Sequence, residues 1–228
     1  MIQVIDEAIK DRNLIEEISN SDTLFPESMG DDTRIASSIN SYHVQSSDCY
    51  APYMFWDGWL ASEPNTTAKR IIKAIWENNL PFPIEELCGF EYWMRTFKAG
   101  QFIDLHLDED TFLYKLENIK NGSAIGCVYY PHTNEQEDCG YLEIYNDYYI
   151  PDHEVDVLSK DKMDFYKSDA KSISSIQCSP NRAVIFDAGH VLHKTTPTKQ
   201  HTKRVMVINV WHKDLQPSAL TTDEFFYE

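Results

Sequence analysis

The feature that most limits the possible folds is a series of short apolar runs that begins near residue 90 and continues to residue 211. Runs of this kind, rich in β-branched and aromatic residues and separated by turn residues, predict β-strands. The runs cover residues 90–97, 101–107, 124–130, 141–145, 172–178, 183–186 and 205–211. Because many short strands follow helical segments, we expect an α+β fold whose strands form a double-stranded β-helix, that is, a cupin-like jelly roll.

Two helices are expected before the strands. In residues 4–18, apolar side chains recur at approximately helical spacing. A second helix should start after the capping sequence Asn65-Thr66-Thr67 and end before Pro81. Its apolar residues share one face, so we expect the N-terminal helices to pack on the outer face of one sheet.

One domain is enough for the whole chain. A chain of 228 residues that is 42% hydrophobic can bury a sizeable core, and single β-domains of this length are ordinary. We therefore expect one domain over residues 1–228, with a helical and aromatic-rich part (1–89), a jelly-roll core (90–212) and a C-terminal tail (213–228).

The charge and the N-terminal sequence narrow the choice of partners and compartment. The formal net charge is −17, which argues against a nucleic-acid partner because binding to phosphates depends on Lys and Arg. No run is long enough to span a membrane, and residues 1–7 lack the pattern of a secretory signal. The five cysteines show no CxxC spacing and predict neither a zinc site nor a disulfide framework. We expect a cytoplasmic protein with no membrane contact.

The candidate chemistry is centred on His106 and Asp108, which lie in one of the expected strands. Alternate side chains of a strand face opposite sides, so these two project the same way. A second histidine from a distant strand, His193, would complete two imidazoles and one carboxylate, the ligand set of non-haem Fe(II) oxygenases. His190 is the alternative second histidine. Asp104 and Asp110 share the parity of His106, so either could orient a ligand, although Asp110 could simply cap the following turn.

A basic residue beyond His193 could hold an organic anion. Residues 199–202 are polar and predict a turn, and residues 204–211 predict a returning strand, so we expect a hairpin with its tip near Gln200. In that register His193 lies opposite about Ile208, and Arg204 lies roughly 13 Å nearer the tip. This distance suits a 2-oxo acid that chelates iron at one end and meets a guanidinium at the other.

These motifs resemble the 2-oxoglutarate and Fe(II)-dependent dioxygenase superfamily, and within it the prolyl 4-hydroxylase-like branch. The similar sequence motifs lie within residues 90–212 and are Phe97-Lys-Ala-Gly100, His106-x-Asp108, Gly140-Tyr-Leu-Glu-Ile-Tyr145, and His193-x-x-x-Pro197 followed by Arg204. The resemblance implies that His106, Asp108 and His193 bind the iron and form the catalytic centre. It also implies that a basic residue ten or eleven positions after His193 binds 2-oxoglutarate.

By that resemblance Arg204 is the candidate for the cosubstrate, with Lys203 as its rival, and strand alternation favours Arg204. Phe97 stands where relatives often have a cosubstrate-binding tyrosine, and Cys139-Gly140 replaces a pair of glycines. Relatives that halogenate lack the carboxylate, so Asp108 favours hydroxylation.

The implied reaction hydroxylates a C–H bond with O2 and releases succinate and CO2, with ascorbate as a candidate reductant. The substrate would be a small molecule or a peptide, for example a free amino acid or a prolyl residue. A cupin-like metal-binding protein without oxygenase activity, either an isomerase or a small-molecule binding module, remains the alternative and would not need Arg204. Residues 146–171 are longer than a hairpin requires, and form either a lid or a surface excursion.

Overall fold

The computed structural model describes residues 1–21, 23–27, 34–35, 54–110, 113, 117, 119–131, 139–154, 159–198, 202–215, 217 and 226–227. The expected turn tip at Gln200 lies outside these residues. Among the described helices, none is long and apolar enough to cross a membrane.

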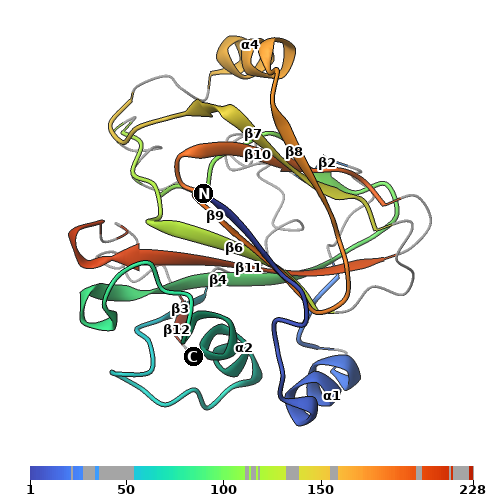
Figure 1. Ribbon diagram of the computed structural model, residues 1–228, viewed down its shortest axis with the longest axis vertical. Coiled ribbons are helices and arrows are strands. Elements are labelled where there is room, and N and C mark those ends of the chain that lie inside the picture. The colour runs from blue at the N-terminus through green and yellow to red at the C-terminus, as the bar shows by residue number, and fades with distance from the viewer. Residues whose placement is uncertain are drawn as a thin grey trace.

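The described strands form two main sheets that face each other (Figure 1). The large sheet has seven strands in the order β1-β9-β6-β11-β4-β3-β12, and the small sheet has the order β10-β7-β8. In the large sheet the strands are β1 (Ile2–Ile5), β3 (Met54–Trp56), β4 (Leu87–Phe97), β6 (Ile125–Tyr130), β9 (Arg182–Phe186), β11 (Lys203–His212) and β12 (Phe226–Tyr227). In the small sheet they are β7 (Tyr141–Tyr149), β8 (Ile173–Gln177) and β10 (Val191–Thr195), and β2 (Arg34–Ile35) pairs separately with β5 (Phe102–Ile103).

The chain passes repeatedly from one sheet to the other. After β4 in the large sheet, the segment containing β5 runs on to His106, which forms a bridge with His193 of β10 in the small sheet. Then β6 belongs to the large sheet, β7 and β8 to the small, β9 to the large, β10 to the small and β11 to the large. This alternation is that of a double-stranded β-helix, and it confirms the predicted fold class.

The expected hairpin that places His193 opposite Ile208 does not form, so that prediction was wrong. β10 pairs with β7, whereas β11 lies between β4 and β6 in the other sheet. Lys203 pairs with Phe97, and Ile208 pairs with Tyr92 and Cys127. The connection after β10 therefore crosses between the layers instead of reversing within one.

The N-terminal part is partly strand. The apolar residues expected to begin a helix at residue 4 instead form β1, which pairs antiparallel with β9 at the edge of the large sheet. Helix α1 (Arg12–Asn20) starts later, where the Asp11 side chain accepts from two backbone N–H groups. Two 3-10 turns, η3 (Ile84–Glu86) and η4 (Lys213–Leu215), flank the large sheet in sequence before β4 and after β11.

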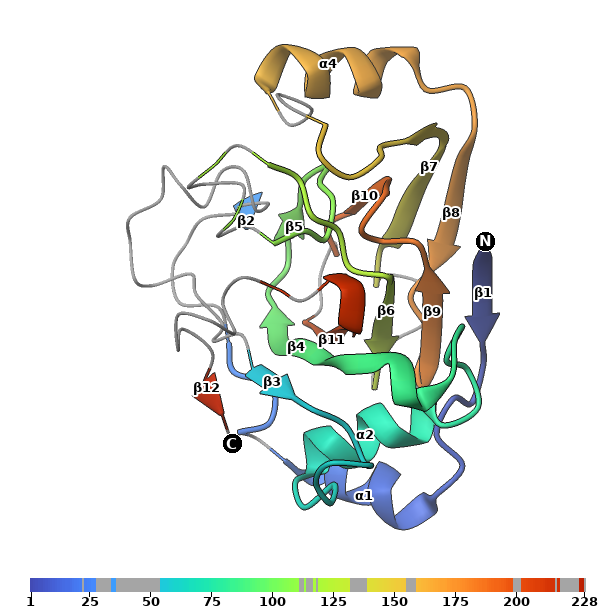
Figure 2. The same cartoon turned by 90° about the vertical axis from the view of Figure 1, so that its left-hand side faces the viewer.

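The second predicted helix is confirmed as α2 (Thr67–Trp76), with Thr66 as its N-cap. Its apolar face is fully buried at Ile71, Ile72 and Trp76. Burial of one such side chain contributes about 1.5–3 kcal/mol. The side chains of α1 and α2 form one core cluster with outward-facing residues of β4, β6, β9 and β11, so both helices cover the outer face of the large sheet, as predicted (Figure 2).

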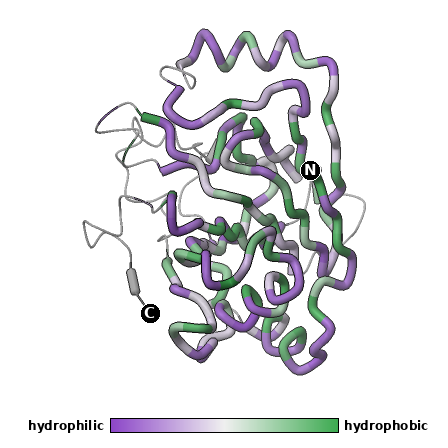
Figure 3. The backbone as a smooth tube through the Cα atoms, turned by 60° about the vertical axis from the view of Figure 1, so that its left-hand side comes forward, coloured by the Kyte–Doolittle hydropathy of each residue, from purple (hydrophilic) through white to green (hydrophobic). Residues whose placement is uncertain are grey.

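A helix also covers the outer face of the small sheet. Helix α4 (Lys160–Asp169) lies in the segment between β7 and β8 and buries Met163 and Tyr166. These two side chains share a cluster with Leu105, Leu107 and Leu192, which are neighbours in sequence of the predicted iron ligands. The remainder of α4 is largely polar, as the purple stretch of Figure 3 shows.

Candidate metal centre

His106 and His193 come together through a backbone contact between two strands. The His106 N–H donates to the His193 carbonyl (2.9 Å), and the His193 N–H donates to the His106 carbonyl (3.0 Å). The two residues form an isolated antiparallel bridge, in which side chains directly opposite point to the same face. Their imidazole centroids are consequently 4.2 Å apart.

Asp108 completes a group of three potential metal ligands. One ligand atom from each of His106, Asp108 and His193 lies within 4.8 Å of the others. Asp108 Oδ1 is 3.4 Å from His106 Nε2 and 3.6 Å from His193 Nε2. The Asp108 N–H donates to the Ala188 carbonyl (2.8 Å), which fixes the strand beside the turn that precedes β10. The structure thus brings together all three residues that the sequence selected.

Backbone carbonyls fix the orientation of both imidazoles. His106 Nδ1 is 2.7 Å from the Asp104 carbonyl, and His193 Nδ1 is 3.1 Å from the Val191 carbonyl. Because a carbonyl can only accept, each Nδ1 carries the proton and each Nε2 offers its lone pair. The Phe186 ring packs edge-on to His193 at 4.8 Å between centroids. Both Nε2 atoms are therefore presented to Asp108 in the form that binds a metal.

The electrostatics of the group also suit a cation. Burial alone would raise the pKa of the Asp108 carboxyl, but the adjacent His193 and His106 rings lower it well below its ordinary value. Burial and the neighbouring His106 lower the pKa of His193. At neutral pH the group is therefore a carboxylate with a neutral His193. Two imidazoles and one carboxylate on one side of a site are the facial ligand set of non-haem Fe(II) oxygenases, so these residues fit Fe(II).

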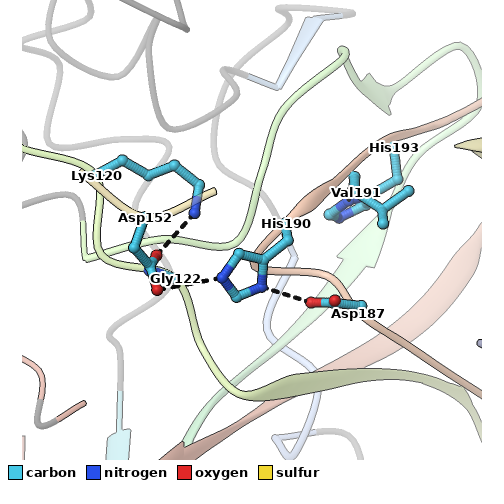
Figure 4. A network of polar contacts seen from close by, with 7 residues as sticks. All are labelled: Lys120, Gly122, Asp152, Asp187, His190, Val191 and His193. Atoms are coloured by element: carbon cyan, nitrogen blue, oxygen red, sulfur yellow. Dashed lines mark hydrogen bonds and ion pairs between the residues drawn. The ribbon is translucent and has the colours of Figure 1, made fainter. Parts of the chain in front are cut away.

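His190, the alternative ligand, lies outside this group. Its Nδ1 is 2.7 Å from Asp187 Oδ1, and its Nε2 is 3.3 Å from Asp152 Oδ2 (Figure 4). Burial lowers the pKa of His190, but the two carboxylates outweigh it and raise that pKa above its ordinary value. Both ring nitrogens of His190 therefore face carboxylates and not the group formed by His106, Asp108 and His193. Of the two aspartates with inward parity, Asp104 contributes its carbonyl to His106, and the Asp110 carboxylate accepts from the Leu113 N–H, which caps the following turn.

The two candidate cations for the cosubstrate face opposite sides of β11. Val205 and Val207 belong to the cluster between the two sheets, and Met206 and Ile208 belong to the cluster under the helices. By this alternation Lys203 faces the interior between the sheets, and its exposure is 0%. Arg204 faces outward, and its guanidinium lies 5.9 Å from the Phe25 ring centroid. The expectation that Arg204 faces the interior was wrong, because β11 pairs with β4 and β6 instead of β10, and Val205 and Val207 are the residues that face the small sheet.

Lys203 lies in a group that the sequence reasoning identified only in part. Its Nζ is 5.4 Å from the ring centroid of Phe97, which is fully buried, and donates to the Thr196 carbonyl (3.3 Å). The Cys178 thiol lies beside both Lys203 and Tyr130. The Tyr130 hydroxyl is buried beside this thiol, which is a weak acceptor.

Tyr130 was missed, although one signal was available. It has the same strand parity as Val128 and Gly126, and Gly126 lies next to Asp108. Burial raises the pKa of the Tyr130 hydroxyl, so it remains a neutral donor.

Comparisons with known proteins identify structural likenesses only. No protein-family model matches the chain, and no curated protein sequence matches it. The chain is similar to a Pseudomonas putida prolyl-4-hydroxylase, with 13% identity over 93% of this chain and 88% of that chain and a TM-score of 0.45. It is also similar to a Trichoplax adhaerens prolyl hydroxylase in complex with a hypoxia-inducible factor peptide fragment. The identity is 10% over 93% of this chain and 84% of that chain, and the TM-score is 0.47. A third similar structure is a viral collagen prolyl hydroxylase from Paramecium bursaria Chlorella virus-1. The identity is 12% over 92% of this chain and 94% of that chain, and the TM-score is 0.48.

All three neighbours are prolyl hydroxylases. These similarities are weak, so the chemistry proposed below rests on the chain's own residues.

Proposed function

We propose that the chain is an Fe(II)- and 2-oxoglutarate-dependent dioxygenase that hydroxylates a C–H bond, with His106, Asp108 and His193 as the iron ligands. The observation that carries the proposal is the convergence of these three side chains, with both imidazoles fixed as Nδ1–H tautomers. A single buried carboxylate or histidine can have many structural roles. Two imidazole lone pairs and a carboxylate that converge on one point are typical of a metal site.

Lys203 is proposed to hold the distal carboxylate of 2-oxoglutarate, with Tyr130 as a second donor. A fully buried ammonium is unfavourable unless an anion compensates it, and Lys203 forms no ion pair with a carboxylate among the described residues. The buried Tyr130 hydroxyl has the Cys178 thiol, a weak acceptor, beside it. One bound carboxylate would satisfy both donors. Phe97 would contribute an apolar wall beside the carbon chain of the cosubstrate.

Iron with 2-oxoglutarate bound would supply the oxidation of the C–H bond by O2, releasing succinate and CO2. The protein contributes binding and orientation. The carbonyls of Asp104 and Val191 keep the Nε2 atoms of the two histidines directed at the metal, and the Asp108 carboxylate supplies the negative charge. Apolar residues between the sheets, among them Val128, Val184 and Val207, keep water from the site.

The substrate is proposed to be a peptide or a small molecule, with a prolyl residue or a free amino acid as first candidates. This part of the proposal rests on the motif resemblance. Ascorbate is proposed as a reductant that restores Fe(II). The second candidate function, a cupin-like metal-binding protein without oxygenase activity, would use the same three ligands but would leave Lys203 and Tyr130 without a ligand.

The test is an anaerobic titration of metal-free protein with Fe(II) and then 2-oxoglutarate, following the visible charge-transfer band of a chelated 2-oxo acid. The wild type should develop a saturable band, and His193→Ala should lose it. His212→Ala is the matched control, because His212 contacts Glu86 and Asp214 outside the candidate site. Iron binding without a band would favour the cupin-like alternative, and no iron binding would refute the proposed centre.

A further inference from the structure

The segment between β7 and β8 makes a first contact beside the candidate metal centre, at Asp104, two residues before His106. Lys167 of α4 forms an ion pair with Asp104 (Nζ to Oδ2, 2.9 Å), and the other Asp104 oxygen accepts from the Leu105 N–H (2.8 Å). The Asp104 carbonyl is the group that fixes the His106 ring. The contact made by α4 therefore holds the residue that determines which nitrogen of His106 faces the metal.

A second point of contact lies near His193 and involves Asp152, which follows β7. Its Oδ1 accepts from Lys120 Nζ (2.9 Å) and from the Gly122 N–H (2.8 Å), and its Oδ2 lies 3.3 Å from His190 Nε2 (Figure 4). Lys120 is fully buried. His190 continues the chain of contacts to Asp187, so the network joins three separate parts of the chain.

Two further contacts join His190 to the last residue of β7 and to the residue after it. The Ile150 N–H donates to the His190 carbonyl (2.8 Å). The Tyr149 ring stacks on the His190 ring, with centroids 5.2 Å apart and an interplanar angle of 9°. Side chain, backbone and ring contacts thus all fix the turn before β10.

That turn carries the groups that orient the other two ligands. The Ala188 carbonyl accepts from the Asp108 N–H (2.8 Å), and the Val191 carbonyl accepts from His193 Nδ1 (3.1 Å). Ala188 and Val191 directly flank the Gly189-His190 pair, and the contacts described above hold His190 in place. A shift of the turn would therefore move an aspartate and a histidine of the metal centre together.

We propose that residues 146–154 and 159–171, which comprise the end of β7 and described parts of the segment after it, act as a brace that orients all three metal ligands, through Lys167 on the His106 side and Asp152 on the His193 and Asp108 side. This inference rests on the proposed metal centre. We propose a fixed support instead of a movable lid. Met163 and Tyr166 of α4 are buried in one cluster with Leu105, Leu107 and Leu192, and opening of a lid would expose these apolar side chains to water. Asp152 and Lys167 are positioning residues that act through His190 and Asp104.

The experiment measures binding of Co(II) alone to the metal-free full chain, by its visible absorption, in the wild type and five variants. Asp152→Asn and Lys167→Met each remove one contact of the brace, and the double variant removes both. Asp169→Asn is the matched control, because Asp169 lies at the end of the same helix and its Oδ2 accepts from the Tyr148 hydroxyl (2.8 Å), within the brace itself. Loss of such outer contacts typically weakens metal binding by about 10- to 100-fold. We expect that increase in Kd for each single variant, restoration by Lys167→Arg, and a change of less than about twofold for the control.

A second readout does not depend on metal. Long-range 1H–15N spectra of the metal-free protein report the imidazole tautomers, and the wild type should show Nδ1–H for both His106 and His193. We expect Lys167→Met to produce a tautomer mixture at His106 alone, and Asp152→Asn at His193 alone. Unchanged Kd and unchanged tautomers in both variants would overturn the brace, as would an equal weakening in Asp169→Asn, which would indicate general destabilisation. If the wild type bound no Co(II) while the variants still showed the expected tautomer changes, the metal centre would be refuted and the orienting contacts would be supported.

Discussion

Replacing Lys203 with methionine discriminates between the two candidate cations for the cosubstrate. Lys203 is fully buried and faces the interior between the sheets, whereas Arg204 lies on the outer face over Phe25. Methionine retains most of the length and apolar volume of lysine without its charge. The substitution should therefore leave the fold intact while removing the ammonium that we assign to the carboxylate of 2-oxoglutarate.

The size of the effect follows from the kind of contact that is lost. A hydrogen bond to a charged group contributes about 1.5–3 kcal/mol. Since a factor of ten in affinity corresponds to about 1.4 kcal/mol, Lys203→Met should raise the Kd for 2-oxoglutarate by roughly 10- to 150-fold. Arg204→Ala should change it by less than about twofold, because its guanidinium points away from the interior.

The assay is the anaerobic 2-oxoglutarate titration of the Fe(II)-loaded protein, with the iron affinity of each variant measured first. Iron binding should be the same in all three proteins, because neither Lys203 nor Arg204 belongs to the ligand group. The reasoning would be refuted if Arg204→Ala weakened 2-oxoglutarate binding and Lys203→Met did not, since the inward face of β11 would then carry no cosubstrate contact.

Three further predictions follow from other parts of the chain. Tyr130→Phe should raise the Kd for 2-oxoglutarate about tenfold in the same titration without affecting iron binding, because one donor to the carboxylate is lost; an unchanged Kd would place the carboxylate elsewhere. Burial and the nearby Asp108 and Asp110 raise the pKa of Glu91 to about 8 from an ordinary 4.5. Between pH 4.5 and 8 the folded state therefore binds more protons than the unfolded state. The free energy of unfolding of the metal-free protein, measured with denaturant, should fall by a few kcal/mol as the pH rises through this range. In Glu91→Gln the free energy of unfolding should depend less on pH. Ile72→Ala should cost about 2–5 kcal/mol in the same unfolding measurement, because Ile72 is fully buried under the large sheet, and a loss below about 1 kcal/mol would contradict that packing.

The convergence of His106, Asp108 and His193 could be predicted because its signal is local. His106 and Asp108 lie two positions apart in a strand, and His193 lies in a short apolar context that predicts another strand. The jelly roll followed from the number and length of the strands. Each of these inferences needs only the period of a strand and the chemistry of the side chains.

The orientation of β11 could not be predicted, and the reason is physical. Both faces of this strand are covered, one by the small sheet and the other by the helices, so apolar residues occupy odd and even positions alike from Val205 to Ile208. A strand without alternation gives no indication of which residue faces inward. The crossing between sheets before Lys203 then determined the parity, and that crossing is a property of the whole topology.

The N-terminal strand was missed for a similar reason. The predicted helix included Ile5, which lies three and four residues before Ala8 and Ile9, and this is the spacing of a helical face. Pairing with β9, which lies far along the chain, decides in favour of the strand. The roles of Asp152 and Lys167 likewise depend on contacts between distant segments and leave no local pattern.

The reciprocal backbone bridge between His106 and His193 has a consequence for how the protein is made. This contact can form only after β6, β7, β8 and β9, which separate the two residues in sequence, have taken their places in the two sheets. A growing chain that has emerged only as far as β9 therefore holds two of the three candidate ligands and no complete site. Late closure of this kind is slow to form because the loop entropy is paid first. A metal that binds only the closed state would stabilise it by about 4 kcal/mol at a thousandfold excess over its Kd. Metal content would then report whether a molecule has finished folding.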